Sequence, residues 1–159
     1  MDVAYINPFI EGIDLLFSNM LDTKAQRGKL SLASCTNGGT DVTAIIGMSG
    51  PARGTVALGF PVSTALAMAS RLLDEDIKTM NPDVTDAMAE MVNIVAGSAK
   101  SKLSKGDQPI DLGLPSIVRG ADLELEQPRG SRWIEVPFTT EFGKFYMRVA
   151  FERGTEAQS

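Results

Sequence analysis

The residues best suited to chemistry lie in the second half of the chain, spaced four, three and four apart: Asp86, Glu90, Asn93 and Gly97. In a helix these positions fall on one side, because residues three and four apart are neighbours on a helical surface. A carboxylate can bind a cation, and a carboxamide can hold a water molecule or another polar group. A glycine lets a second backbone approach closely. We call these residues the polar stripe.

The polar stripe has two interpretations at this point. In the first, Asp86 and Glu90 are solvated surface acids, Asn93 is tolerated, and Gly97 makes room for another part of the same chain. In the second, the stripe docks a partner: Glu90 reaches a cation, Asn93 presents its amide, and Gly97 permits close approach. A glycine inside a helix costs about 1 kcal/mol relative to alanine, so both interpretations need a compensating contact. Spacing alone does not choose between them.

The signals around the stripe predict a long helix. Asn81 is expected to cap it, Pro82 to occupy its first turn, and Gly106 to end it. Charges follow the helix dipole, with acids early and lysines late: Asp83, Asp86, Lys100, Lys102 and Lys105. Apolar residues gather on the side opposite the stripe: Val84, Met88, Met91, Val92, Val95, Ala99 and Leu103. The stripe should therefore face solvent.

Other elements are expected before and after this helix. A helix over 7–21 should begin with Asn7 as cap and Pro8 in its first turn. Its buried face should hold Phe9, Ile13, Leu16, Phe17 and Met20. Apolar runs at 30–35, 42–48 and 55–60 predict a three-stranded antiparallel meander, followed by a helix over 63–73.

The C-terminal part should contribute a hairpin of strands 133–140 and 144–153, with Trp133 and Phe138 in the core. The stretch 110–126 fits either an edge strand or a connecting loop. The predicted fold class is α+β, a mainly antiparallel sheet with helices packed on it. One domain should span 1–154, with a polar tail over 155–159.

Composition excludes several classes of function. The 159 residues contain no histidine, which removes histidine-based hydrolysis and histidine-ligated metal sites. The single cysteine, Cys35, is expected to be a small buried hydrophobe in a reducing, cytoplasmic setting. A net charge of −5 argues against nucleic acid and anionic membranes as partners. The acids at 74–76 predict a solvated loop rather than a metal site, so we expect no metal and no cofactor in this chain.

Three segments carry a resemblance to a known family. The run DAMAEMVNIVAGSAK over 86–100 resembles the active-site helix of the CheC/CheX/FliY chemotaxis phosphatases, whose signature is Asp-x3-Glu-x2-Asn with a downstream glycine. The opening YINPFI over 5–10 and the hairpin over 46–56 also resemble the CheX branch. The chain is identified as a CheX-like member of this family.

The resemblance implies a phosphatase acting on the aspartyl phosphate of a CheY-like response-regulator receiver. In that family the residue matching Glu90 pairs with a receiver lysine, and the residue matching Asn93 orients the attacking water. Asp86 and Gly97 would then be partner-binding residues, and Mg²⁺ would belong to the receiver. One alternative is a non-catalytic module that binds a receiver or a flagellar-switch component, and another is a structural homodimerisation domain.

Two further expectations follow from the resemblance. The CheC branch carries a second signature on the first helix, where this chain offers only Asn7, Glu11 and Asp14. Because an ionised aspartate cannot donate a hydrogen bond as asparagine does, a single site is expected, on the later helix. The CheX branch also pairs two chains through sheet edges, so a homodimer is expected, with 110–126 as the contact.

Overall fold

The computed structural model describes residues 3–33, 35–36, 40–50, 52–104, 109–120, 125–126 and 132–153. Its helical elements are η1 (Val3–Ile6), α1 (Asn7–Leu16), η2 (Phe17–Leu21), α2 (Val62–Leu73) and α3 (Pro82–Leu103). Its longer strands are β4 (Val42–Ser49), β5 (Ala52–Phe60), β9 (Trp133–Thr140) and β10 (Gly143–Arg153). Its shorter strands are β1 (Gln26–Arg27), β2 (Ser31–Ala33), β3 (Cys35–Thr36), β6 (Asp111–Leu112), β7 (Ser116–Arg119) and β8 (Leu125–Glu126). None of the helices in these ranges is both long enough and apolar enough to cross a membrane.

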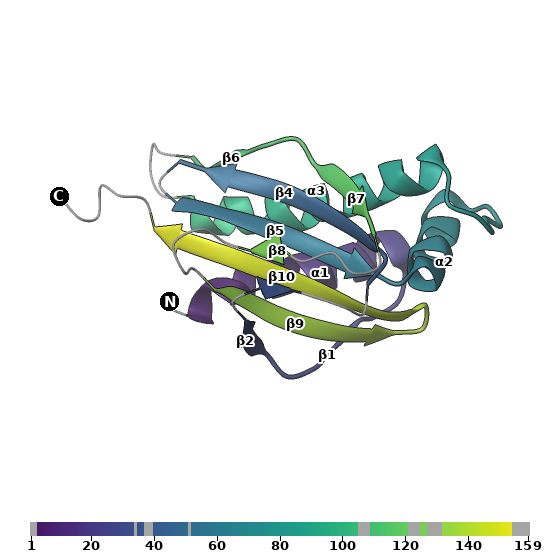
Figure 1. Ribbon diagram of the computed structural model, residues 1–159, viewed down its shortest axis with the longest axis horizontal. Helices are drawn as coiled ribbons and strands as arrows, with labels where there is room; N and C mark the ends of the chain where they lie inside the picture. Colours follow the sequence, from purple (N-terminus) through teal and green to yellow (C-terminus); the bar gives the residue numbers. More distant parts are fainter. Residues whose placement is uncertain are drawn as a thin grey trace.

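The strands form one large antiparallel sheet and one small one. The order in the large sheet is β1-β9-β10-β5-β4-β6, with β2 also on β9 and β7 also on β4 (Figure 1). Strands β3 and β8 pair separately. The predicted α+β class with a mainly antiparallel sheet is confirmed, as is the closing hairpin of β9 and β10.

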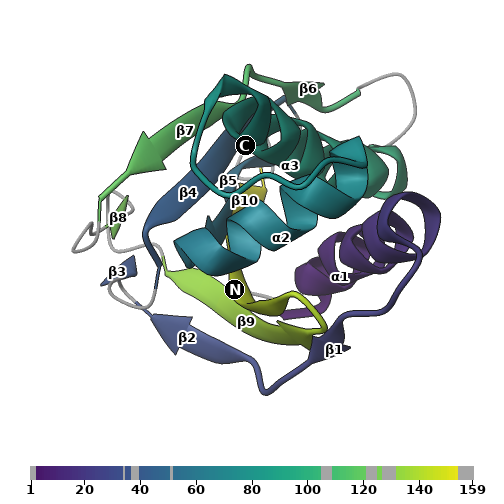
Figure 2. The same ribbon diagram turned by 90° about the vertical axis from the view of Figure 1, so that its right-hand side faces the viewer.

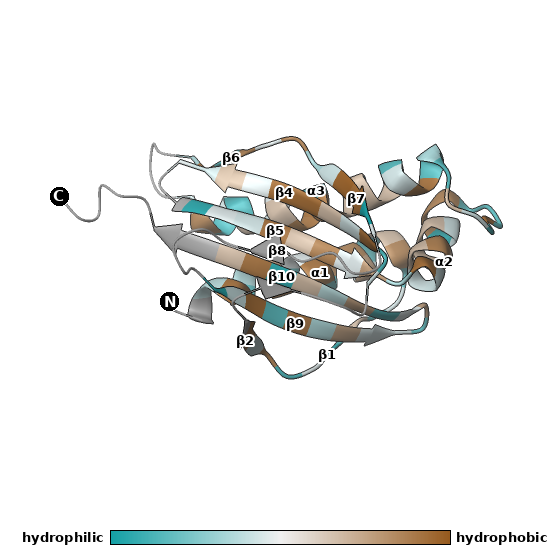
Figure 3. Ribbon diagram, in the orientation of Figure 1, coloured by the Kyte–Doolittle hydropathy of each residue, from teal (hydrophilic) through white to brown (hydrophobic). Residues whose placement is uncertain are grey.

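The helices lie together on one face of the large sheet, and β3 and β8 lie on the other (Figure 2). Side chains alternate along the central strands, so that β4 turns Val42, Ala44 and Ile46 toward the helices, all of them buried. Brown bands of apolar residues accordingly recur along the strands and helices (Figure 3). Trp133 and Phe138 are both buried as expected, but Trp133 lies on the opposite face, packed with Ala57 and Ala150.

The predicted three-stranded meander is wrong. β4 and β5 do form a hairpin, in register from Val42 opposite Phe60 to Met48 opposite Gly54. The run 30–35 instead leaves this hairpin: β2 pairs with β9 at the far side of the sheet, and β3 pairs with β8. The outer edge of β4 is occupied by β6 and β7, so no position beside it is left for the earlier run.

The first helix covers the expected residues but differs at both ends. The 3₁₀ turn η1 leads directly into α1, so Asn7 is the first helical residue and makes no capping bond. At the other end η2 is a π-helical turn, with more residues per turn than an α-helix. The extra residue rotates the apolar face, which leaves Met20 44% exposed and buries Leu21 completely.

The stretch 110–126 contains three short strands among its described residues: β6, β7 and β8. β6 and β7 extend the sheet beyond β4, and Ile110 beside them is buried. The helix predicted over 63–73 is confirmed as α2, although its last residue, Leu73, is 39% exposed. The long helix ends earlier than predicted: its last residue is Leu103, and Ser104 caps it in an extended conformation, so the expected end at Gly106 is wrong. The surroundings of the Cys35 side chain and the tail 155–159 lie outside the described residues.

Candidate functional site

The position of the polar stripe is set by the start of α3. Asn81 has extended backbone dihedrals, and its side-chain oxygen accepts a hydrogen bond of 3.0 Å from the Val84 N–H. Pro82 follows at the first helical position, where its missing N–H has no cost. The predicted cap is therefore confirmed, and α3 runs for 22 residues without a break.

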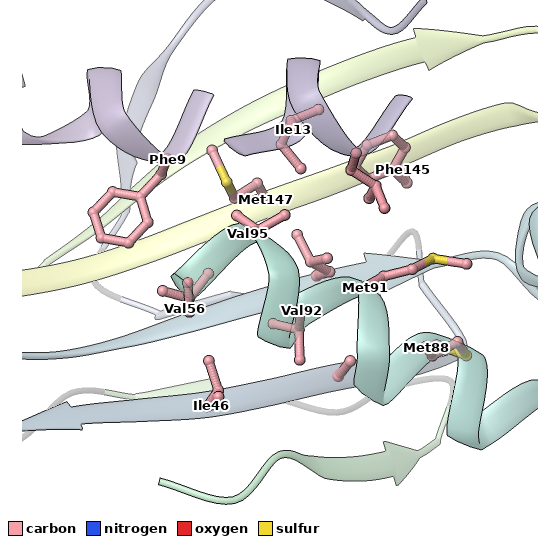
Figure 4. Close-up of a cluster of buried hydrophobic side chains, with 14 of the residues drawn as sticks. Phe9, Ile13, Ile46, Val56, Met88, Met91, Val92, Val95, Phe145 and Met147 are labelled. Atoms are coloured by element: carbon pink, nitrogen blue, oxygen red, sulfur yellow. The ribbon is translucent and has the colours of Figure 1, made fainter. Parts of the chain in front are cut away.

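The inner face of α3 holds the helix against the sheet and against α1. Of the seven predicted core residues, Leu103 is half-buried and the other six are buried. The buried six are Val84, Met88, Met91, Val92, Val95 and Ala99. Figure 4 shows Met88, Met91, Val92 and Val95 of this set in one cluster with Ile46, Val56 and Met147 of the strands and with Phe9 and Ile13 of α1. α1 comes very close at Gly12, where an added Cβ would be 2.9 Å from the Val95 carbonyl oxygen. This contact fixes the rotation of α3.

The outer face of α3 carries the polar stripe. Asp86, Glu90 and Asn93 are exposed and Gly97 is half-buried. Across the described residues, the side chains of Glu90 and Asn93 form no hydrogen bond or ion pair within the chain. An added Cβ on Gly97 would meet no atom within 4 Å. The interpretation that Gly97 makes room for another part of this chain is therefore wrong, as far as the described residues extend.

The first helix presents a similar but altered surface. Asn7, Glu11 and Asp14 are all exposed, at the spacing of Asp86, Glu90 and Asn93. The Glu11 carboxylate, however, forms an ion pair of 2.8 Å with the Lys102 ammonium at the end of α3. Sequence reasoning placed Lys102 only near the helix dipole and missed this pair, because nothing local in the sequence links residues 91 positions apart. Glu11 thus has a partner within the chain, whereas Glu90 has none among the described residues.

Among the described residues, no cluster of metal-ligating side chains lies beside the stripe. The acids at 74–76 are exposed, as expected of a solvated loop. Nowhere in the described ranges do three potential metal-ligating side chains of Cys, Asp or Glu converge. What α3 can offer chemically is a carboxylate for a cation, an amide for water or an anion, and an unobstructed approach beside them.

Comparison with known protein families shows which family this chain belongs to. A family model described as chemotaxis phosphatase CheX matches residues 42–139, which run from β4 to β9 and include the whole of α3. The chain belongs to the CheX family. The family expectation drawn from the 86–100 segment is confirmed.

Individual relatives agree in sequence and in fold. The CheY-P phosphatase CheX of Thermotoga maritima is 24% identical over 127 residues, covering 79% of this chain and 82% of the relative. A CheC-like superfamily protein from Shewanella sp. PV-4 has a TM-score of 0.83 at 29% identity, covering 96% of this chain and 99% of its own. The CheX of the CheX–CheY–BeF3–Mg²⁺ complex of Borrelia burgdorferi has a TM-score of 0.76 at 24% identity, covering 94% and 98%.

Proposed function

We propose that this CheX-family chain hydrolyses the aspartyl phosphate of a CheY-like receiver, with Glu90 and Asn93 as its catalytic residues. The observation that carries the proposal is the outer face of α3. There an acid and an amide, three residues apart, are exposed and have no partner among the described residues. Membership of the CheX family supports the class of reaction, and the exposure of these two side chains supports their choice as the catalytic residues.

The chemistry suits a site without histidine or metal ligands. An acyl phosphate is already reactive, so catalysis is mainly a matter of positioning water and neutralising charge. The Asn93 amide has both a carbonyl oxygen to accept from water and N–H groups to donate to a phosphoryl oxygen. Residues three apart on a helix have Cβ atoms about 5–6 Å apart, so Glu90 can bind a receiver lysine while Asn93 enters the same site.

The remaining stripe residues have supporting roles in the proposal. Asp86 and Gly97 contact the partner, Asp86 through its carboxylate and Gly97 by leaving the surface open. The Mg²⁺ that neutralises phosphoryl charge belongs to the receiver, and this chain supplies no cofactor. Two relatives support a CheY-like receiver as the partner: one is named a CheY-P phosphatase, and another is seen in complex with CheY.

Phosphate release tests the proposal. The purified chain is mixed with a panel of phosphorylated CheY-type receivers, and inorganic phosphate is followed with time. Asn93→Ala should lower turnover by about 10²-fold, as expected for loss of one transition-state hydrogen-bonding group. Glu90→Ala should raise KM instead, and the wild-type KM should rise with salt if a lysine is the partner of Glu90.

Two matched variants control for surface changes. Asn19→Ala removes an exposed amide from η2, and Glu75→Ala removes an exposed acid from the loop after α2, so both should retain full activity. Full activity of both stripe variants would refute the assignment of the site. Binding of phosphorylated receiver by the wild type without phosphate release would identify a non-catalytic receiver-binding module instead.

A further inference from the structure

We propose that Lys100 extends the polar stripe and binds the phosphoryl group of the docked receiver. This inference rests on the proposed function, since it names a further residue of the same site. Lys100 lies in the last part of α3 and is half-buried. It adds a cation to a surface whose other charges, at Asp86 and Glu90, are negative.

Helical geometry places Lys100 in line with Asn93. The two residues are seven apart, which is almost two turns at about 3.6 residues per turn, so they differ by only about 20° around the helix. At about 1.5 Å per residue, their Cα atoms lie about 10 Å apart along the axis. Helical side chains lean toward the N-terminus, so the Lys100 stem can extend back along the stripe toward Asn93 when a receiver docks.

The space between the two residues is open. Gly97 lies between Lys100 and Asn93 on this face, and a Cβ there would meet no atom within 4 Å. An extended lysine stem of roughly 6 Å therefore can lie over Gly97 without obstruction. The Lys100 ammonium then lies about 4 Å along the helix axis from the level of the Asn93 backbone, so both side chains can reach one phosphoryl group placed over this part of the helix. Gly97 thus gives the lysine its path as well as giving the partner close approach.

Lys100 is also available for a partner. In the described residues it forms no ion pair, whereas Lys102, two residues later, is paired with Glu11. Both lysines lie near the negative end of α3, so a favourable interaction with the helix dipole is common to both. What distinguishes Lys100 from Lys102 is its position on the polar stripe.

Charge explains what Lys100 would contribute. In the reaction the water oxygen bonds to phosphorus, the bond from phosphorus to the receiver aspartate breaks, and the aspartate leaves as a carboxylate. Both hydrogens of the water end on the released phosphate, so Lys100 transfers no proton. Its ammonium stabilises negative phosphoryl oxygens beside Asn93, whose amide carries no net charge.

The test compares two lysines of one helical turn. Lys100→Gln should lower kcat/KM for phosphate release by about tenfold, as expected for loss of a charged hydrogen bond. Lys100→Arg should recover most of that loss. Lys102→Gln, which removes the same charge from the same end of α3, should leave kcat/KM unchanged, and thermal unfolding should report any common loss of stability.

A binding measurement identifies the group that Lys100 meets. Affinity is measured for CheY with Mg²⁺ and beryllofluoride and for CheY with Mg²⁺ alone. Lys100→Gln should weaken only the first, because only that form carries a phosphoryl mimic. Equal weakening of both would place Lys100 against a receiver carboxylate and overturn the inference, as would unchanged kcat/KM in an otherwise active protein. An inactive wild type would instead refute the proposed function itself.

Discussion

Replacing Gly97 by leucine should stabilise the protein and abolish its activity. Leucine has a helix propensity higher than glycine by about 0.8 kcal/mol, because glycine loses more backbone entropy on folding. The structure adds no opposing cost at the Cβ, since none of the described atoms lies within 4 Å of that position. For a chain of 159 residues this gain corresponds to a rise in melting temperature of about 2–4 °C.

The same substitution should block docking. A leucine at position 97 projects from the outer face of α3 between Asn93 and Lys100, where a receiver must approach. Thermal unfolding followed by circular dichroism measures the stability, and phosphate release from a phosphorylated receiver measures the activity. Gly97→Ala separates the two effects, because its gain in propensity is at least as large, about 1 kcal/mol, but it adds only one methyl group.

A fall in melting temperature for Gly97→Leu would refute this reasoning, since it would mean that another part of the chain occupies the space. Unchanged activity in a stabilised variant would show that no partner approaches α3 at this position. Either result would remove the physical support for a close approach at Gly97.

Three more predictions concern the support of the site and the assembly of the chain. Gly12→Ala should destabilise the protein by about 1–3 kcal/mol in urea unfolding, since its new Cβ would be 2.9 Å from the Val95 carbonyl oxygen; unchanged stability would mean that α1 shifts freely on α3. Asn81→Ala should cost about 1 kcal/mol by removing the 3.0 Å bond to Val84, and an unchanged unfolding midpoint would show that the cap is dispensable. Light scattering should give about twice 17.0 kDa if two copies associate, and a strictly monomeric mass would remove that expectation.

The parts of the structure that sequence predicted are those with local causes. The cap at Asn81, the apolar periodicity of α3 and the tight β4–β5 hairpin each depend on residues close together in the chain. These causes were enough to place the polar stripe on the solvent side. Local patterns also predicted which of the main segments are helices and which are strands.

The parts that sequence missed depend on distant residues. Nothing within the run 30–35 indicates that its strand pairs with β9, about a hundred residues later, because an alternating pattern records a buried face and not a partner. The ion pair of Glu11 with Lys102 likewise requires the packing of α1 on α3. The π-helical turn η2 changed which residue is buried, Leu21 in place of Met20, because a helix wheel assumes one period throughout.

All the residues assigned to the site belong to one uninterrupted helix. The geometry of the site is therefore separate from the stability of the rest of the fold, two properties that most active sites couple. The spacing of Glu90 and Asn93 is set by the backbone hydrogen bonds of α3 alone, not by how separate loops or domains meet. Substitutions in the sheet should therefore change the fraction of molecules that are folded while leaving the rate per folded molecule constant.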